Sequence, residues 1–153
     1  MIRLLPDSLK EQIAVHEAEG STEDPAHLAA MEAYYVRHLR RQPERSPADA
    51  DSARTMSASF VYQYRWGPIG YTSTGTLKRF DSTDALRNHI RAPALFLAGE
   101  FDEATPSSTE AFSRLVPNAE FASIPGAGHS TENDNPDPLF RTVRSFLQRA
   151  EGR

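Results

Sequence analysis

Apolar residues recur at helical spacing in the first part of the chain, and they predict three amphipathic helices between residues 7 and 65. The first helix should be capped by Asp7 and stopped by Gly20. The second should begin with a capping acid at Asp24 and Pro25 in its first turn. The expected buried positions of the three helices are Leu9, Ile13 and His16, then Leu28, Met31, Tyr35 and Leu39, then Ala53, Met56, Phe60 and Tyr64.

The second part of the chain changes character. The run "ALFLAG" lies between Pro93 and Gly99, is apolar on both faces and predicts a buried parallel strand, and "EFASIPG" predicts a second strand. A helix capped by Thr105 should join the two strands, and another should close the chain from Asp137 onward. The inward positions expected on these two helices are Ala111, Phe112, Leu115 and Val116, then Leu139, Phe140, Val143, Phe146 and Leu147. Strand, helix, strand and helix form a unit of a parallel sheet, so the predicted fold class is α/β.

Composition narrows the function classes. The 153 residues suit one domain or a piece of a larger one. A net charge of -4 with 17 scattered Lys and Arg argues against nucleic acid or an anionic membrane as partner. The absence of cysteine excludes disulfides, thiolate nucleophiles and thiolate metal sites. With no membrane-span run and no signal-peptide order at the N-terminus, we expect a soluble, cytoplasmic protein.

Acids and a histidine follow the two predicted strands. Asp102 and Glu103 come just after the first strand, and His129 follows the second in a glycine-rich turn. Reactive groups gather beyond the carboxyl ends of parallel strands, and an acid that holds one imidazole nitrogen leaves the other free to take a proton. Three alternatives stay open: Asp102 as a cap of the next helix, His129 as a surface turn residue, and Glu103 as a solvated neighbour.

The other histidines do not predict a metal site. His16, His27, His38 and His89 lack acidic partners at ligand spacing, so we interpret them as structural or surface residues. No cofactor is expected.

Four stretches of the chain resemble the proline iminopeptidase subfamily of serine α/β-hydrolases. They are "EAEGSTEDPAHLAAMEAYYVRHLRR", "WGPIGYTSTGTLKRFD", "GEFDEATP" and "IPGAGHSTEND", in this order over nearly the whole chain. The resemblance implies a partial α/β-hydrolase fold, with a partial helical cap at residues 1–75 followed by the last strand-helix-strand-helix of the core at residues 76–153.

The same resemblance implies roles for single residues. Asp102 matches the acid of the catalytic triad and His129 its base, while Glu103 matches a carboxylate that binds the charged N-terminus of a peptide substrate. A charge-assisted hydrogen bond to that ammonium would suit an exopeptidase. The family usually has a second carboxylate in the cap, where this sequence has Gly70, and this departure puts strict aminopeptidase specificity in doubt.

The nucleophile of the family is missing from these 153 residues. No Gly-x-Ser-x-Gly and no His-Gly-Gly sequence occurs, and Ser73 in "GYTSTG" is a poor substitute because Tyr71 stands where the elbow needs glycine. In the family these elements precede the cap, so the sequence resembles the C-terminal half of such an enzyme.

The functional hypothesis is therefore the C-terminal portion of a serine hydrolase that releases N-terminal proline or a related residue from peptides or amides. Alone, the chain is expected to be inactive. The alternatives are an amidase or esterase of the same fold, and a non-catalytic remnant or association partner. The expected partners are a small peptide or amide substrate in the intact enzyme, and an N-terminal half or a second copy at the exposed sheet edge.

Overall fold

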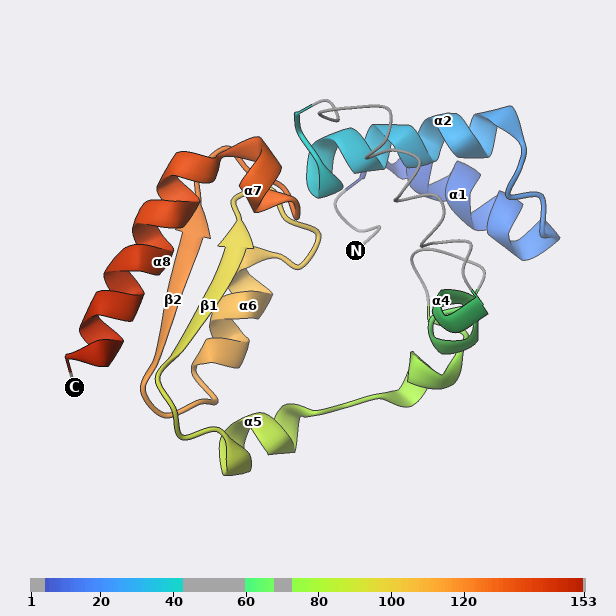
Figure 1. Cartoon of the computed structure of the whole chain (residues 1–153). Helices are drawn as coiled ribbons and strands as arrows, with labels where there is room; N and C mark the ends of the chain where they lie inside the picture. The colour runs from blue at the N-terminus through green and yellow to red at the C-terminus, as the bar shows by residue number, and fades with distance from the viewer. Residues whose placement is uncertain (1–4, 43–59, 68–72, 153) are drawn as a thin grey trace. The chain divides into compact units, whose positions relative to one another are not determined.

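The computed structural model describes residues 5–42, 60–67 and 73–152. The chain divides into two compact units, one formed by Met1–Glu32 and Pro43–Asp81 and the other by Ala33–Gln42 and Ser82–Arg153 (Figure 1). Within the described ranges, no helix is long and apolar enough to cross a membrane. The predicted division into a cap at 1–75 and a core at 76–153 stays a prediction.

The first helix, α1, spans Asp7–Glu19 and ends where predicted. Gly20 has a φ of 69°, and the N–H of Ser21 donates to the carbonyl of His16 over 2.9 Å, which closes the helix. Its start differs from the prediction. Pro6 occupies the capping position and no side chain caps the helix, because Asp7 already lies in the first turn and pairs with Lys10 at 3.0 Å.

The second helix, α2, spans Pro25–Tyr34 and continues into a π-helical turn, η2, at Tyr35–Leu39. Its start is confirmed, since Asp24 Oδ1 accepts the N–H of Ala26 at 2.8 Å. The predicted face was partly wrong: Leu28 is 51% exposed. The buried side chains of α2 are His27, Ala30, Met31 and Tyr34. The buried stripe thus lies about one position away from the predicted one, and Tyr35 and Leu39 are only half-buried.

Most of the third predicted helix, including Ala53 and Met56, lies outside the described residues. A short helix, α4, spans Phe60–Arg65, and a 3-10 turn, η3, follows at Thr76–Arg79. Phe60 and Tyr64 were expected to face inward, but they are exposed and stack on each other with ring centroids 5.8 Å apart. Residues four positions apart lie on the same face of a helix, so the two rings contact each other while both stay exposed.

The other unit is built on two parallel strands, β1 at Ala94–Gly99 and β2 at Ala119–Ile124, as predicted. Their register pairs Ala94 with Ala119 and Gly99 with Ile124. In Figure 1 the strands lie between helix α6, Pro106–Ser113, and helix α8, Pro136–Glu151. The predicted cap of α6 is confirmed, because Thr105 Oγ1 accepts the N–H of Ser108 at 3.3 Å.

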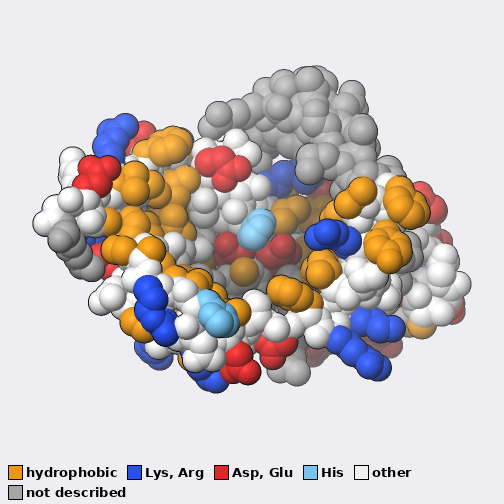
Figure 2. Space-filling view, turned by 60° about the horizontal axis from the view of Figure 1, so that its bottom comes forward, with side chains coloured by type: hydrophobic (Ala, Val, Ile, Leu, Met, Phe, Trp, Pro, Cys, Tyr) orange, Lys and Arg blue, Asp and Glu red, His pale blue; other side chains and the backbone are white. Residues whose placement is uncertain are grey.

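A small core lies against this sheet. Ile124, Ala127 and Leu139 are buried together, with Leu97 and Val143 packed against them. Several positions expected to face inward are instead exposed: Ala111, Phe112, Phe140 and Leu147. A two-stranded sheet is narrow, so each helix can bury only a thin stripe of its side chains against it. The apolar side chains that are not buried lie on the surface, and Figure 2 shows hydrophobic side chains gathered there at the left of the view.

Two further short helices in this unit were not predicted. Helix α5 spans Thr83–His89 and precedes β1, and helix α7 spans Thr131–Asp134 and follows β2. Helix α7 is a single turn, held by the N–H groups of Asn133 and Asp134, which both donate to the carbonyl of Ser130 at 3.0 Å. It lies directly after His129 and shapes the loop that carries this residue.

Candidate active site

Two loops leave the same edge of the sheet, because β1 and β2 are parallel and end at the paired residues Gly99 and Ile124. The loops are tied to each other by backbone. The N–H of Glu100 donates to the carbonyl of Ile124, and the N–H of Phe101 donates to that of Ala127, both over 2.9 Å. The residues that follow each strand are therefore held at fixed separation.

Gly99 permits the loops to approach closely. A Cβ at this position would overlap the backbone carbonyls of Ala127 and Gly128. Since any side chain would force the loops apart, glycine at the end of β1 is a requirement of the site's geometry.

Asp102 is buried in the first loop, with only 4% of its surface exposed. Its carboxylate is compensated by backbone donors: the N–H of Gly99 lies 3.2 Å from Oδ2, and the N–H of Ala104 lies 2.8 Å from Oδ1. A buried carboxylate needs such donors to offset its loss of hydration. The cap of α6 is Thr105, so the alternative in which Asp102 serves only as a helix cap does not hold.

The structure brings Asp102 and His129 together. His129 Nδ1 lies 3.0 Å from Asp102 Oδ1, within the hydrogen-bond distance that a paired acid and base require. A carboxylate only accepts, so Nδ1 carries the proton and donates it, and Nε2 keeps its lone pair. The His129 side chain is 54% exposed, which leaves Nε2 accessible to a reacting group.

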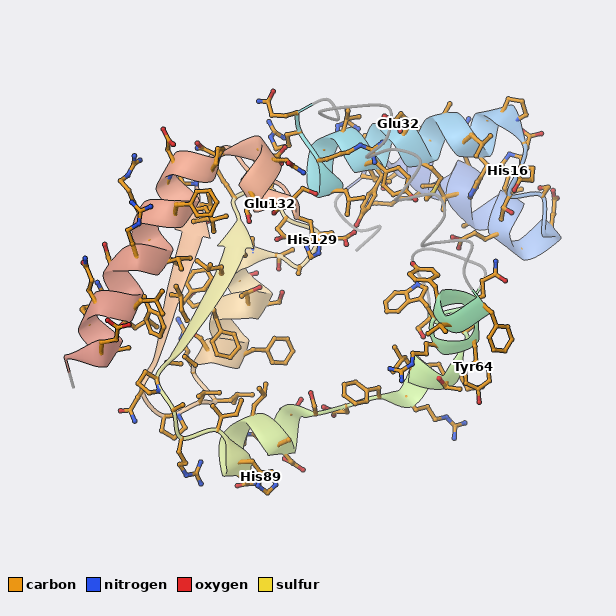
Figure 3. The ribbon with its side chains drawn as sticks, in the orientation of Figure 1. His16, Glu32, Tyr64, His89, His129 and Glu132 are labelled. Carbon is orange, nitrogen blue, oxygen red and sulfur yellow. The ribbon has the colours of Figure 1, made fainter. Side chains whose placement is uncertain are left out.

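The electrostatic surroundings of His129 are acidic. The hydrogen bond to Asp102 raises the pKa of His129 above its ordinary value of 6.5, partial burial acts in the opposite direction, and the charges of Asp102, Glu103 and Glu132 raise the pKa further. Figure 3 shows His129 beside the head of the β1 arrow, with Glu132 on α7. The acidic neighbours favour the imidazolium form that a base creates when it accepts a proton.

Glu103 has a partner that the sequence did not suggest. The hydroxyl of Tyr34, near the end of α2, donates to Glu103 Oε2 over 2.8 Å. Tyr34 is buried, and burial, followed by the hydrogen bond and charge of Glu103, raises the pKa of Tyr34 well above its usual range, so the hydroxyl stays a donor. Within the described ranges, Glu103 Oε1 takes part in no hydrogen bond.

The segment Ala33–Gln42 contacts both loops. The N–H of His129 donates to the carbonyl of His38 at 2.9 Å, and His38 Nδ1 lies 2.7 Å from the carbonyl oxygen of Phe101. The site residues that sequence reasoning missed are therefore Tyr34 and His38, together with Asp134, whose carboxylate accepts the N–H of Gly128. Their partners are 69 residues away or are backbone groups, which no local pattern encodes.

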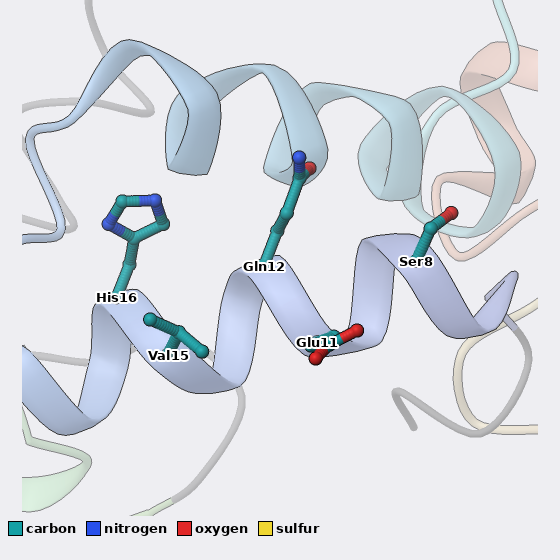
Figure 4. A pocket seen from close by; sticks show the side chains of 5 residues that line it. All are labelled: Ser8, Glu11, Gln12, Val15 and His16. Atoms are coloured by element: carbon teal, nitrogen blue, oxygen red, sulfur yellow. The ribbon is translucent and has the colours of Figure 1, made fainter.

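The remaining candidates lie elsewhere or outside the described residues. Gly70 is not described, and Ser73, whose buried hydroxyl has no partner among the described atoms, belongs to the unit of Met1–Glu32 and Pro43–Asp81. No group of three or more metal-ligating side chains occurs in the described part of the chain. A pocket of about 320 Å³ on α1 is lined by Ser8, Glu11, Gln12, Val15 and His16 and includes none of the predicted site residues (Figure 4).

No protein-family model matches the chain. Among curated proteins, a proline iminopeptidase of Heyndrickxia coagulans is 32% identical over 149 residues, which cover 95% of this chain and 50% of that protein. The chain thus spans about half the length of the curated relatives it matches.

Solved structures agree with this match. The crystal structure of a proline iminopeptidase from Mycobacterium smegmatis has a TM-score of 0.84 and 33% identity, and covers 97% of this chain and 50% of that one. The crystal structure of VinJ has a TM-score of 0.85 and 27% identity with the same coverage. The similarity drawn from the sequence motifs and the partial α/β-hydrolase fold are therefore confirmed, and the half coverage is consistent with a C-terminal half.

Proposed function

We propose that this chain, which resembles the proline iminopeptidases over 95% of its length, is the C-terminal portion of a serine hydrolase that releases N-terminal proline or a related residue. The observation that carries the proposal is the 3.0 Å contact between Asp102 and His129 at the ends of neighbouring parallel strands. In this proposal residues 1–75 are part of a cap and residues 76–153 part of the core, in a cytoplasmic enzyme that needs no cofactor.

The proposed chemistry is acyl transfer to a serine that these 153 residues do not supply. His129 Nε2 takes the proton of the serine hydroxyl as its oxygen attacks the carbonyl carbon, and then passes that proton to the leaving amine. Asp102 holds the imidazole by Nδ1 and stabilises the transient imidazolium. Water then attacks the acyl-enzyme with His129 again as base, which releases the N-terminal residue and restores the serine.

Glu103 is the proposed site for the substrate's ammonium group. Oε2 is held by Tyr34, so the carboxylate is oriented before substrate binds, and Oε1 remains available for a charge-assisted hydrogen bond. One carboxylate acting alone would bind the amine less strongly than two, so the glycine at position 70 predicts weaker discrimination for a free N-terminus.

That glycine also favours a second candidate, an amidase or esterase of the same fold. A pocket with one anionic group tolerates neutral substrates better than a pocket with two. The two candidates share Asp102 and His129 and differ in their use of Glu103.

A third possibility is a non-catalytic remnant or association partner. Among the described residues β1 pairs only with β2, so its other edge presents unpaired backbone groups. The proposed occupant of that edge is the N-terminal half of a hydrolase, with a second copy of this chain as the alternative. Light scattering of the isolated chain separates a monomer from a self-associated form.

The function is tested by mixing the chain with the N-terminal half of the Heyndrickxia coagulans relative. We expect no release of a chromogenic amine from a prolyl amide by the chain alone, and release by the mixture. If the substrate is an N-acetylated prolyl amide, an aminopeptidase should lose most of its rate, whereas an amidase or esterase should keep it. A soluble, stable mixture that hydrolyses none of these substrates contradicts the proposal and favours the remnant.

A further inference from the structure

Hydrogen bonds between backbone groups join the loop that carries His129 to the segment Ala33–Gln42. The carbonyls of His38 and Leu39 accept the N–H groups of His129 and Ser130 at 2.9 and 2.8 Å. These carbonyls lie at the C-terminal end of the π-helical turn, where helix geometry leaves the last carbonyls without partners inside the helix. The helix end therefore supplies two acceptors, and His129, the proposed base, donates its backbone N–H to one of them.

Asp134 forms a second connection between the loop and this segment, in which the loop supplies the acceptor and the segment the donors. Its Oδ1 accepts the N–H groups of Arg41 and Gln42, each at 2.8 Å, just after the helical turn has ended. Its Oδ2 accepts the N–H of Gly128 at 2.7 Å, one residue before His129. One carboxylate thus joins the segment to the loop and also fixes the loop internally.

Close packing makes this arrangement sensitive to small shifts. A Cβ at Gly128 would lie 2.8 Å from the carbonyl oxygen of His38, closer than real Cβ contacts. The Arg41 guanidinium lies 4.0 Å from the centre of the Phe101 ring, which ties the segment to the other loop as well. Movement of the segment would displace both loops and so change the distance between Asp102 and His129.

We propose that Asp134 is a positioning residue for His129, which it holds against Asp102 by anchoring the segment Ala33–Gln42 to the loop 126–134. The inference rests on the proposed function, because it gives His129 the role of base. Asp134 does not touch the reacting atoms; it acts through Gly128 and through the backbone bond between His38 and His129.

Within the described residues, the charges that raise the pKa of His129 are those of Asp102 and Glu103, from the loop after β1, and of Glu132 on α7, and Asp134 is not among them. A change at Asp134 that alters the pKa of His129 would therefore act through the position of the imidazole, since it leaves all three of these groups in place.

The test uses the 153-residue chain and the variants Asp134→Asn, Asp134→Ala, Asp102→Asn and Asp84→Asn. Asparagine keeps the size of Asp134 but cannot accept at both positions, because its NH₂ group must face at least one N–H donor. Asp84 is an exposed acid in the same unit and provides the matched Asp-to-Asn control. Two properties are measured by NMR: amide exchange at Gly128, Arg41 and Gln42, and the pH titration of the His129 imidazole.

We expect Asp134→Asn to speed exchange at one or more of these amides by about 10- to 100-fold, the range expected for loss of a charged hydrogen bond. The pKa of His129 should fall in the same variant, toward its value in Asp102→Asn, and Asp84→Asn should change neither property. Asp134→Ala should show the same changes more strongly; if it does not fold, Asp134→Asn carries the test.

The positioning role is overturned if Asp102→Asn lowers the pKa of His129 but Asp134→Asn leaves this pKa at its wild-type value. Asp134 would then be a structural residue only. Fast exchange at all three amides in the wild-type chain overturns the positioning role as well. If Asp102→Asn itself leaves the titration unchanged, the acid and base pair of the proposed function is contradicted, and the inference fails together with it.

Discussion

The Tyr34 hydroxyl and the Glu103 carboxylate form a 2.8 Å hydrogen bond between residues that are 69 positions apart. The bond joins the segment Ala33–Gln42 to the loop after β1 within one compact unit, and Tyr34 is buried, as is Asp102 in that loop. The same bond orients Glu103 through Oε2, while Oε1 takes part in no hydrogen bond within the described residues, as the proposed ammonium site would need.

Replacement of Tyr34 by Phe should lower the free energy of unfolding by about 1.5 to 3 kcal/mol, the usual cost of removing a hydrogen bond to a charged group. Urea denaturation measures the change. Tyr64→Phe removes a hydroxyl from an exposed ring on α4 and should stay within about 0.5 kcal/mol. Equal effects of the two substitutions would show that the hydroxyl of Tyr34 contributes nothing specific.

A methyl group at Gly99 should destabilise the chain, because it overlaps the carbonyls of Ala127 and Gly128. The expected cost of Gly99→Ala is about 1 to 3 kcal/mol, typical of overpacking. Gly152→Ala is the matched control, since its nearest neighbour would lie 3.5 Å away. A Gly99→Ala chain as stable as the control would mean that the two loops are not packed as described.

The contribution of His129 to stability should depend on pH. Its pKa is raised in the folded state, mainly by the hydrogen bond to Asp102, so the protonated form is favoured by folding. The stabilisation is therefore complete below the unfolded value of 6.5 and is lost as the pH rises through the higher folded value. The difference in unfolding free energy between wild type and His129→Gln should shrink over that interval, and this loss should be clearly smaller in an Asp102→Asn background, which removes the largest cause of the raised pKa.

The assignment of the α6 cap also has a measurable consequence. Thr105→Ala removes the oxygen that accepts the N–H of Ser108 and should cost about 0.5 to 2 kcal/mol in chemical denaturation. If Thr105→Ala is neutral, some other group caps the helix, and the alternative role of Asp102 as a capping acid is open again.

The sequence allowed prediction of the elements whose signals are local. Both strands of the sheet lie where short apolar runs predicted them, and the dipeptide Thr105-Pro106 marked the start of α6. Placing Asp102 and His129 after parallel strands was enough to anticipate their 3.0 Å contact, because parallel strands end at the same edge.

The errors concern features that depend on tertiary packing. Leu28 and Phe112 satisfy a helical stripe but are exposed, because the surface on which each helix packs decides which face is buried. Neither Tyr34 nor Asp134 could be predicted as part of the site, since the first bonds a residue far along the chain and the second bonds only backbone N–H groups. Such contacts leave no spacing pattern in the sequence.

The central claim is that His129, oriented by Asp102, acts as the base of a serine hydrolase. Its most direct test is the rate of prolyl amide hydrolysis by this chain assembled with the N-terminal half of the Heyndrickxia coagulans relative, compared with the same assembly carrying His129→Ala. We expect the substitution to lower the turnover by at least about 10⁴-fold while the two halves still associate, since loss of a triad base costs on the order of 10⁶-fold in a well-studied serine protease. Hydrolysis that persists at the unsubstituted rate in the His129→Ala assembly would contradict the role of His129 as the base.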